Sequence, residues 1–580
     1  MSRSTSPSVS RRERRRVGLM LAATWVCFLF RGALYSVVLP IWEGYDEPYH
    51  FASIQYFIAT RSLPGLYTPI SREVEASLHF VPLSRAMGRQ GIRKPFYTHD
   101  DLWKLSPEER ESLEKKFREI PSSWANESPP GAMPNYEGQQ PPLFYALFSL
   151  LMRALHGRSL ASRVFILRFA AIAVASLVIP LGYAVTKRIT GTSETALGIV
   201  ALAAVMPEFC IDMARVGNEC LGLVIYTVLL YVATRIVEGP AEFGKLPVAG
   251  FVLGVGLLTK AYFLTALPAL LVIVLWCGWR WPKEWKRLLS LSGVAVFAAL
   301  AIAAPWYWHV RKANGAWSGL VNASLPRRSQ LEVLAQIPHV HWVDGLLSLI
   351  VSHIWYGGWS FLRAPVVWYV FFGTVFLLAG LGLLLVLFRF RRPDKSNILI
   401  GEGHLVMLVS LYGFFWLGQL YFVLLLFISL RISTSPGWYL YCLVIAELIL
   451  VYIGLQAILP RRTRPWIIPI LTAGFAALDL YGMHFLLIPY YTGVIAHAGY
   501  LDCVSPSRIR DLLGLGVHNV ARRLLVNRPT TLTPGVLYVL WLLGLMGTVW
   551  IAIRPWCLRQ LNTLGSATAT TRPGQGCPLA

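Results

Sequence analysis

Long apolar segments separated by short polar ones recur along the whole chain of 580 residues. A helix needs about 20 apolar residues to cross the hydrocarbon core, and lipid forces its backbone polar groups to pair within the segment. The pattern therefore predicts an all-α polytopic membrane protein, a helical bundle of about 12 transmembrane helices. The candidate segments are residues 17–39, 141–155, 163–186, 194–211, 218–236, 246–259, 261–279, 288–308, 366–389, 402–430, 436–458, 466–488 and 534–553.

The longest polar region is residues 40–140, directly after the first apolar segment. Its Asp46-Glu47-Pro48 sequence predicts a helix start, since Asp caps helices and Pro is favoured in the first turn. Apolar positions at 49–58 predict that this helix lies along the membrane surface. A charged helix is expected over 106–118, and Gln139-Gln140-Pro141-Pro142 marks the start of the next apolar helix.

Basic clusters indicate the orientation of the bundle. Arg280–Arg287, Arg389–Lys395 and Arg461–Arg464 lie in short loops, which the positive-inside rule assigns to the inner side. The basic N-terminus is also predicted to be inside. The segment that follows it is too long for the apolar part of a cleaved signal peptide, and no small-residue cleavage site follows. Polar regions around 40–140, 308–363 and 489–533 are then outside.

The number of candidate transmembrane segments before Arg280 does not agree with the predicted orientation unless one segment is an exception. With the N-terminus inside, an even number of crossings must precede Arg280, but seven candidates do. Either one of the short segments 141–155 and 246–259 does not cross, or two segments form one broken helix. The domains expected are a cytoplasmic N-terminus (1–16), a transmembrane domain (17–490) with the outer loop 40–140, an outer loop with the last helix (491–555) and a disordered tail (556–580).

Arg31 lies in the outer half of the first apolar segment. An arginine there is costly unless its side chain reaches the interface or faces a polar group. Two interpretations stay open: the side chain extends to the outer interface, or it contacts the 40–140 loop.

Composition narrows the function. The chain is 55% hydrophobic and 14% charged, with a formal net charge of +23, and a soluble domain averages about 25% charged. Because the basic residues lie beside apolar segments, they indicate membrane topology and not nucleic-acid binding. The eight cysteines are scattered, without a CxxC pair or zinc spacing.

The acidic cluster that opens the outer loop is the first candidate site. Glu43, Asp46, Glu47 and His50 lie within eight residues just outside the first span. A carboxylate there can take a proton from a hydroxyl, and the group can hold a divalent cation through its oxygens. The simpler alternative is that Asp46 caps the helix and the others face solvent.

Further polar groups lie at the ends of other apolar segments. Lys260 and Arg311 put cations where they can hold a lipid phosphate, although Lys, Arg, Trp and Tyr at span ends also serve as plain interfacial anchors. Asn218-Glu219 and Trp438-Tyr439 combine polar and aromatic groups suited to sugars, and equally suited to starting a helix.

The order of these motifs resembles that of the GT-C superfamily of membrane glycosyltransferases over residues 17–490. The similar features are an Asp-Glu pair after the first span, a Gln-Pro-Pro-Leu-Phe-Tyr sequence closing the first loop, and four later motifs. Asp46-Glu47-Pro48-Tyr49-His50 is similar to a bacterial branch with Asp-Glu-Pro-x-His. The chain differs at Trp438, where an arginine is usual, and at Glu219, where an aspartate is usual. The four later motifs read Asn218-Glu219, Leu258-Thr259-Lys260, Pro305-Trp306-Tyr307 with Arg311, and Gly437-Trp438-Tyr439-Leu440.

The resemblance implies a reaction. The donor would be a sugar on a polyprenyl phosphate, transferred with inversion to a glycan, lipid or protein hydroxyl on the outer face of a bacterial inner membrane. Asp46 would be the general base, with Glu47 beside it, and Lys260 and Arg311 would hold the donor phosphate. The substrate-binding residues would be His50, Gln140, Asn218, Glu219, Trp438 and Tyr439.

Cofactors and competing functions stay open. Asp46, Glu47 and His50 would be the ligands if a metal is used, because the superfamily has metal-dependent and metal-independent members. No nucleotide cofactor is expected, since no phosphate-binding glycine loop is present. The alternatives are a transporter or flippase for a lipid-linked glycan, which is expected to carry mid-span charges and paired broken helices, and a non-catalytic membrane partner in an envelope complex.

Overall fold

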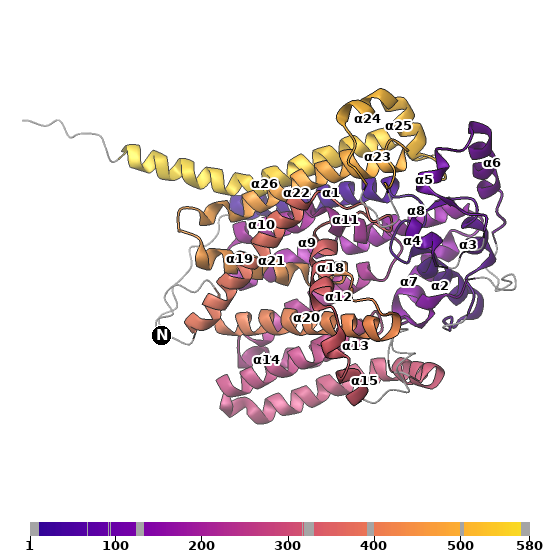
Figure 1. Ribbon diagram of the computed structural model, residues 1–580. Coiled ribbons are helices and arrows are strands. Elements are labelled where there is room, and N and C mark those ends of the chain that lie inside the picture. Colours follow the sequence, from indigo (N-terminus) through magenta and orange to yellow (C-terminus); the bar gives the residue numbers. More distant parts are fainter. Residues whose placement is uncertain are drawn as a thin grey trace, which may run out of the picture.

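The computed structural model describes residues 11–65, 68–90, 92, 94–122, 133–315, 317, 330–390, 400–498, 504–529 and 531–569. These residues form a bundle of long helices, and the 40–140 loop gathers at one end of it (Figure 1). The described residues contain one pair of strands, β1 (Pro82–Leu83) and β2 (Tyr97–Thr98), which run parallel. The predicted all-α class is confirmed.

The bundle is built from helices that are mostly apolar along their length. They are α1 (Arg11–Val38), α8 (Leu160–Ala175), α9 (Val178–Thr190), α10 (Ser193–Val205), α11 (Pro207–Met213), α12 (Glu219–Ile236), α13 (Leu246–Leu257), α14 (Ala266–Arg280), α15 (Trp285–Asn314), α19 (Val366–Phe390), α20 (Glu402–Leu430), α21 (Val444–Ile458), α22 (Ile467–Tyr481) and α26 (Pro534–Ala569). Short turns of 3₁₀ or π helix extend several of them: η2 (Pro240–Lys245), η3 (Ala261–Thr265), η4 (Pro282–Glu284), η6 (Gly437–Leu443), η7 (Arg464–Trp466) and η8 (Gly482–Leu487).

Smaller elements lie in the loops. The 40–140 loop contains α2 (Glu47–Thr60), α3 (Arg72–Ser77), α4 (Arg85–Gly88), α5 (His99–Leu102), α6 (Pro107–Arg118) and η1 (Tyr136–Gln139), and α7 (Leu143–Ala154) follows it. The later loops contain α17 (Gln330–Leu334), η5 (Ile337–His339), α18 (Trp342–Ile354), α23 (Ile488–Tyr491), α24 (Ile509–Leu515) and α25 (Val517–Leu524).

By length and apolar composition, ten helices of the described residues can cross a membrane. The number is eleven if α10 and α11, which meet at a 68° bend, form one span. α26 extends to Ala569, beyond residue 556 where the sequence predicts a disordered tail. Residues 570–580, residues 1–10 of the basic N-terminus, and residues 391–399 of one predicted inner loop lie outside the described part of the chain.

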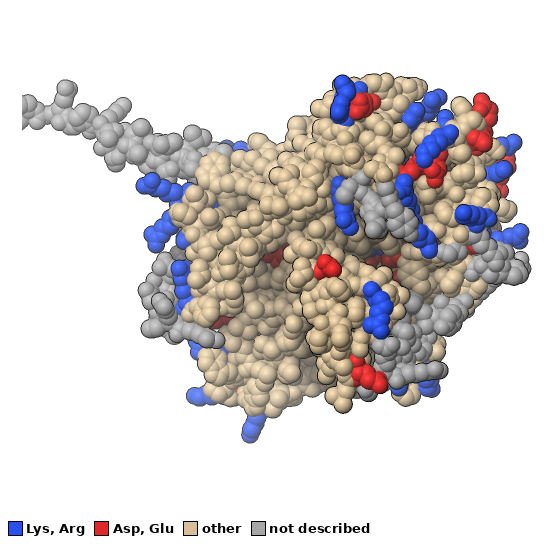
Figure 2. Space-filling view, in the orientation of Figure 1, with Lys and Arg blue, Asp and Glu red and all other residues tan. Residues whose placement is uncertain are grey.

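The two ends of the bundle carry the charges. We call the end with the 40–140 loop the loop end, and the other the far end, where Arg188 and His404 both approach Glu238. On the face shown in Figure 2, Lys, Arg, Asp and Glu gather mostly toward the two ends and leave a broad belt with few charged side chains between them. Such a belt is what the hydrocarbon core of a bilayer requires.

The exception in the crossing count is α7. Its first residue, Leu143, donates its N–H to the Leu258 carbonyl (2.9 Å) at the loop end. The chain is still at that end at Arg163 in the first turn of α8, which pairs with Glu73 of the outer loop. With 12 residues and both ends on one side, α7 does not cross.

The other short segment, α13, is too short to be one of the ten helices above, but it runs from one end of the bundle to the other. α13 is preceded by Glu242, which pairs with Arg235 at the far end (2.5 Å), and is followed by Lys260, which pairs with Glu219 at the loop end. The crossings before Arg280 are then α1, α8 with α9, α10 with α11, α12, α13 and α14. Their number is even, as an inside N-terminus and an inside Arg280 require.

The helix α2 differs from its prediction. Residues 47–55 are all buried, so α2 does not lie on the membrane surface with a free apolar stripe. Its polar face is satisfied within the loop: Gln55 donates to Glu73 (2.6 Å), and Ser53 accepts from Asn135 (3.0 Å). By contrast, α6 forms where the sequence predicts it, opened by a capping box of Ser106 and Glu109.

Arg31 neither extends to the interface nor contacts the outer loop. Its side chain is fully buried, pairs with Asp479 of α22 (2.5 Å) and donates to the Val205 carbonyl (3.1 Å). Tyr35, one turn along α1, also donates to Asp479. Val205 ends α10 at the bend before Pro207, which has no N–H to continue the helix. Arg31 therefore stabilises the helix break, and Asp479 neutralises Arg31 there.

This ion pair leads to a stability prediction. Asp479→Ala leaves Arg31 buried without a counter-charge, so we expect it to destabilise the fold by about 3–5 kcal/mol. The double variant Arg31→Met with Asp479→Leu removes both charges, and we expect most of the lost stability to return. Unfolding midpoints in detergent measure both variants. Equal midpoints for the single and double variants would contradict this account.

Candidate functional site

In the acidic turn at the start of α2, the Asp46 side chain points away from the backbone N–H groups of the helix. Asp46 is the N-cap residue, but its backbone is left-handed (φ 58°) and its side chain makes no capping hydrogen bond. Instead the Tyr136 hydroxyl donates to Asp46 Oδ1. Burial raises the pKa of Asp46, while Tyr136, Arg215 and Lys260 act to lower it. The prediction that Asp46 opens a helix is confirmed, and its carboxylate remains free of the capping role.

Glu47 is used to hold the turn. Arg168 of α8 binds it in a fork, from Nε to Oε1 (2.7 Å) and from Nη2 to Oε2 (2.5 Å). The backbone N–H groups of Trp42 and Val216 donate to the same carboxylate (3.1 and 3.0 Å). Both charged side chains are fully buried. Glu47 has four donors and no open side, so its geometry favours positioning over proton transfer.

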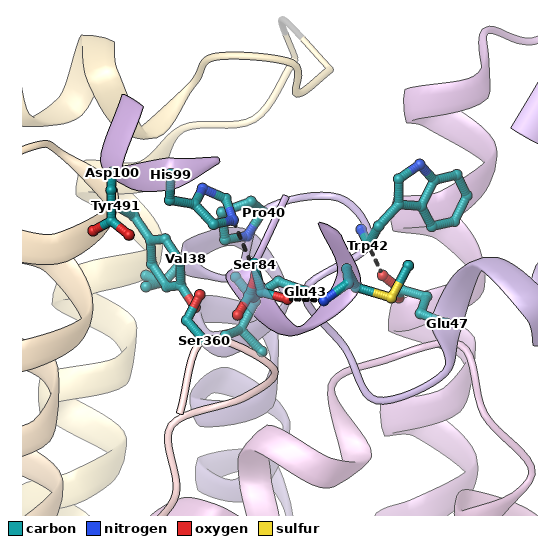
Figure 3. A network of polar contacts seen from close by, with 12 residues as sticks. Val38, Pro40, Trp42, Glu43, Glu47, Ser84, His99, Asp100, Ser360 and Tyr491 are labelled. Carbon is teal, nitrogen blue, oxygen red and sulfur yellow. Dashed lines mark hydrogen bonds and ion pairs between the residues drawn. The ribbon is translucent and has the colours of Figure 1, made fainter. Parts of the chain in front are cut away.

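Glu43 points away from Asp46, into a second polar network. Figure 3 shows Glu43 with His99, Ser360 and Tyr491 on the side opposite the Trp42–Glu47 contact. His99 Nε2 lies 2.9 Å from Glu43 Oε2, and both side chains are buried. The Glu43 carbonyl accepts from Trp359 N–H (3.2 Å). Glu43 therefore ties the start of the outer loop to the segment after α18.

His50 is a buried neutral group. Its Nδ1 lies 2.8 Å from the Tyr145 hydroxyl of α7, and its ring is 1% exposed. Burial lowers the pKa of His50 from 6.5 to about 3, with further lowering by Arg215 and Lys260 and an opposing effect of Glu219. It thus contacts α7 rather than joining Asp46.

Charged residues from three helices meet beside Asp46. Arg215 donates to Asp212 (2.8 Å), pairs with Glu219 (2.9 Å) and donates to the Tyr45 carbonyl (2.5 Å). Lys260, at the end of α13, pairs with the other oxygen of Glu219. The chain Asp212–Arg215–Glu219–Lys260 brings two predicted residues, Glu219 and Lys260, into contact.

Aromatic rings enclose the cations. Lys260 Nζ lies 4.5 Å from the ring centroid of Tyr439. Trp438 stacks on Tyr45, with centroids 3.8 Å apart and planes 3° from parallel. Tyr45 in turn donates to Glu208 (2.8 Å) just after the helix break. The predicted pair Trp438-Tyr439 therefore lies at the site, with Trp438 against the acidic turn.

Asn218 and Gln140 connect the outer loop to α13. Asn218 Nδ2 donates to Gln140 Oε1 (3.3 Å) and to the Thr259 carbonyl (3.2 Å). Next to Gln140, Glu137 has its pKa raised to about 8, first by burial and then by the charge of Asp46. Glu137 therefore belongs to the same cluster as Asp46.

Arg311 is placed differently. It lies in the last turn of α15 and its side chain is exposed. In the described residues no ion pair joins it to the cluster. An apolar cavity of about 880 Å³ lies along α13, α14 and α15, lined by residues from Leu246 to Leu257 and by Tyr307 and Trp308. Arg311 is one turn beyond Trp308, at the loop end of this cavity, and Lys260 is three residues beyond Leu257.

The proposed metal ligands do not converge. Glu47 is fully engaged by Arg168, His50 faces Tyr145, and Asp46 accepts from Tyr136. In the part of the chain that the structure describes, no group of three or more His, Cys, Asp or Glu side chains is arranged to hold a metal ion.

Several residues of the site were not found from the sequence. Arg163 and Arg168 are arginines inside an apolar segment, the same signal that drew attention to Arg31. Asp212 and Arg215 follow an i, i+3, i+7 spacing with the predicted Glu219 on one helical face, although the α11–α12 junction interrupts the helix. Tyr136 and Glu137 carried no such signal, because their partner Asp46 is 90 residues away.

The sequence profile of the dolichyl-phosphate-mannose-protein mannosyltransferase family matches residues 139–309. That range contains Gln140, Asn218, Glu219 and Lys260, but not Asp46. No curated protein matches the chain, and no solved structure matches it. Together with the apolar helices, the match supports an integral membrane glycosyltransferase of the GT-C type.

His50 leads to a pH prediction. Its pKa is lower in the folded protein than the ordinary 6.5, so the unfolded chain binds more protons between these values. Stability is therefore full above pH 6.5 and falls by up to about 1.4 kcal/mol per pH unit as the pH drops toward 3. We expect His50→Gln, which can keep the bond to Tyr145, to remove this part of the pH dependence. Unfolding midpoints at pH 7, 6, 5 and 4 test it, and parallel curves for the two proteins would exclude it.

Proposed function

We propose that this protein transfers a sugar from a polyprenyl-phosphate carrier to an acceptor hydroxyl at the loop end of the bundle, with inversion at the anomeric carbon. The observation that supports this best is the position of Asp46. Its carboxylate is released from helix capping, held by Tyr136 and set beside Arg215 and Lys260. A base next to fixed cations is what sugar transfer from a phosphate requires.

Asp46 is the proposed general base. As the acceptor oxygen forms a bond to the anomeric carbon, the bond from that carbon to the phosphate oxygen breaks, and Asp46 takes the hydroxyl proton. The products are the glycoside, the polyprenyl phosphate and a protonated Asp46, which returns its proton to water. A raised pKa suits this role, because a carboxylate of higher pKa is a stronger base as long as it remains ionised.

The donor phosphate is proposed to bind at Lys260. In the described structure Lys260 is paired with Glu219, which keeps its charge compensated when no donor is bound. A phosphate would share the cation with Glu219, while Arg215 still neutralises the other oxygen of Glu219 (2.9 Å). Arg311, exposed at the loop end of the apolar cavity, is proposed to meet the phosphate from the opposite side.

The apolar cavity suits the carrier chain. It runs along α13, α14 and α15 and is lined mainly by Leu, Ala and Val side chains. A polyprenyl tail lying there has its phosphate end near Leu257, and Lys260 is within one turn. The energy for transfer is in the phosphate ester itself.

The orientation and the surrounding residues complete the proposal. Arg287 of the basic segment 280–287 donates to the Pro240 carbonyl at the far end, so by the positive-inside rule we expect Asp46 at the extracytoplasmic face of a bacterial inner membrane. Glu47 and His50 are positioning residues, and Gln140, Asn218, Glu219, Trp438 and Tyr439 surround the substrates. The acceptor is a glycan, lipid or protein hydroxyl.

Replacing the base tests the mechanism. We expect Asp46→Asn to lower the transfer rate by about 10²–10⁴-fold while leaving the unfolding midpoint near that of the wild type, because the amide still accepts from Tyr136. Turnover is measured in detergent with undecaprenyl-phosphate sugars as donors. Asp101→Asn, an exposed aspartate of the same loop, serves as the matched control. Unchanged turnover in Asp46→Asn would remove it as the base.

The cations are tested separately. We expect Lys260→Met to lower kcat/KM for the lipid donor by about 10²–10³-fold, because a fixed charge at the leaving phosphate is lost. Arg311→Ala should weaken donor binding by a smaller factor, since Arg311 is exposed to screening by solvent. Lys283→Ala at the far end is the control. Donor affinity that is the same in all three variants would exclude the phosphate site.

A further inference from the structure

Buried oxygens around Asp46 lack donors. Among the described residues, four amide and carboxyl oxygens at this site are buried without a hydrogen bond or an ion pair: Glu137 Oε2, Gln139 Oε1, Asp212 Oδ2 and Asn218 Oδ1. The Tyr262 hydroxyl near Lys260 is also buried without a hydrogen-bond partner, and it can donate as well as accept. Buried polar groups are nearly always paired, so these groups point to a polar ligand.

The orientation of Asn218 is fixed by its surroundings. Its Nδ2 donates to the Thr259 carbonyl (3.2 Å), and a carbonyl can only accept. Nδ2 also donates to Gln140 Oε1 (3.3 Å). The amide is therefore not flipped, and Oδ1 faces the other way. Asn218 is fully buried, so Oδ1 is an acceptor held in place with no donor in the described residues.

Glu137 lies on the other side of Gln140. η1 carries both Glu137 and Tyr136, the residue that donates to Asp46. The charges of Asp46, Lys260 and Glu219 all act on Glu137, and Gln140 hydrogen-bonds it. Glu137 and Asn218 are thus both hydrogen-bonded to Gln140, and the charge of Asp46 acts on Glu137. Thr259, which fixes Asn218, is the neighbour of Lys260.

The cluster has more carboxyl groups than cations. Its carboxyl groups are Asp46, Glu137, Asp212 and Glu219, and its cations in the described residues are Arg215 and Lys260. Both cations are already engaged by carboxylates and a backbone carbonyl. Asn218 Oδ1 needs a donor, whereas Glu137, with its pKa raised to about 8, is protonated at neutral pH and can donate as well as accept. A hydroxyl, which both donates and accepts, can pair with either group, while a carboxylate or a phosphate brings only acceptors.

We propose that Glu137 and Asn218 form a hydroxyl-binding subsite that holds the sugar ring of the donor beside Asp46. This inference rests on the proposed function. The sugar hydroxyls donate to Glu137 Oε2 and Asn218 Oδ1, while the phosphate of the same donor lies at Lys260, next to Thr259. Gln140 holds both side chains in place through its hydrogen bonds to them.

The subsite selects a class of sugar. A neutral hexose or pentose supplies hydroxyl donors to both oxygens. A uronic acid would place a further negative group beside Asp46, where like charges repel in a poorly solvated site. The expected donor is therefore an uncharged sugar with free hydroxyls on the ring face turned toward Gln140.

Deoxy donors test the contacts one at a time. Turnover is measured with undecaprenyl-phosphate mannose, glucose and galactose, with each monodeoxy analogue of the hexose that is transferred best, and with its uronic acid. We expect the wild type to lose about 10- to 100-fold in kcat/KM for the deoxy analogue that lacks a hydroxyl bound by Glu137. In Glu137→Ala we expect kcat/KM to be about equal for the parent donor and this deoxy analogue, while the other deoxy analogues remain as poor as with the wild type.

Matched variants separate a local role from a structural one. Asn218→Leu removes the acceptor and should lose discrimination at its own hydroxyl while keeping discrimination at the hydroxyl bound by Glu137. Glu108→Ala, an exposed glutamate of the same loop, should leave every ratio unchanged. If Glu137→Ala lowers turnover equally for all donors, or if the uronic acid is used as well as the neutral sugar, the subsite is wrong.

Two further outcomes are distinguishable. In the first, a chelator abolishes transfer, Mn²⁺ restores it, and Glu137→Ala needs a higher Mn²⁺ concentration than the wild type. That result would assign these oxygens to a cation and overturn the hydroxyl subsite, while leaving the proposed reaction intact. No transfer by the wild type from any of the polyprenyl-phosphate hexoses would instead contradict the proposed function itself, and this inference with it.

Discussion

Arg168 holds the start of the outer loop in one geometry. Its guanidinium binds both oxygens of Glu47 and the backbone carbonyls of Ser36, Leu39 and Pro40 (2.8, 2.7 and 2.6 Å). These carbonyls lie at the end of α1, where helical hydrogen bonding has run out. One buried cation therefore satisfies a helix end and a carboxylate together, and it directs the chain into the turn at Asp46. Arg528 assists by donating to the Val37 and Val38 carbonyls.

The same principle places the second half of the site. The bundle contains a bend between α10 and α11, and Arg31 with Asp479 supplies the donor and the counter-charge that the bend needs inside the apolar layer. Beyond the bend, Glu208 accepts from Tyr45 and from the N–H groups of Tyr356 and Gly357. The bend thus directs α11 toward the acidic turn, and Asp212 and Arg215 arrive beside Asp46 as a consequence.

These structural contacts do not involve the side chains that are proposed to react with or bind the substrate. Glu47, Glu43 and His50 are all engaged in holding segments together, whereas Asp46 has one donor, Tyr136, and the acceptors on Glu137 and Asn218 have none among the described residues. Groups that can still form hydrogen bonds, held by a rigid frame of other residues, are suited to binding a substrate. The membrane contributes by excluding water from one side of the cluster, which strengthens each charge interaction.

Much of this architecture is determined by the sequence alone. The apolar segments dictate helices because lipid offers no partner to the backbone, and the position of Asp46 after the first span, the double proline before α7 and the capping box of α6 are local signals that the structure retains. The parity argument left either a short segment that does not cross or two segments that form one broken helix, and the structure identified α7 as the segment that does not cross. The sequence also indicated Lys260, Asn218, Glu219, Gln140 and Trp438-Tyr439, because polar residues at span ends stand out against an apolar background.

The sequence did not distinguish the roles of neighbouring residues in one motif. Asp46, Glu47, Glu43 and His50 contact four different elements, which are η1, α8, α5 and α7 respectively. Only the tertiary structure decided those partners, because the contacts between Glu47 and Arg168 and between Arg31 and Asp479 join residues over 100 positions apart. Each pair forms because either charge buried alone would destabilise the fold.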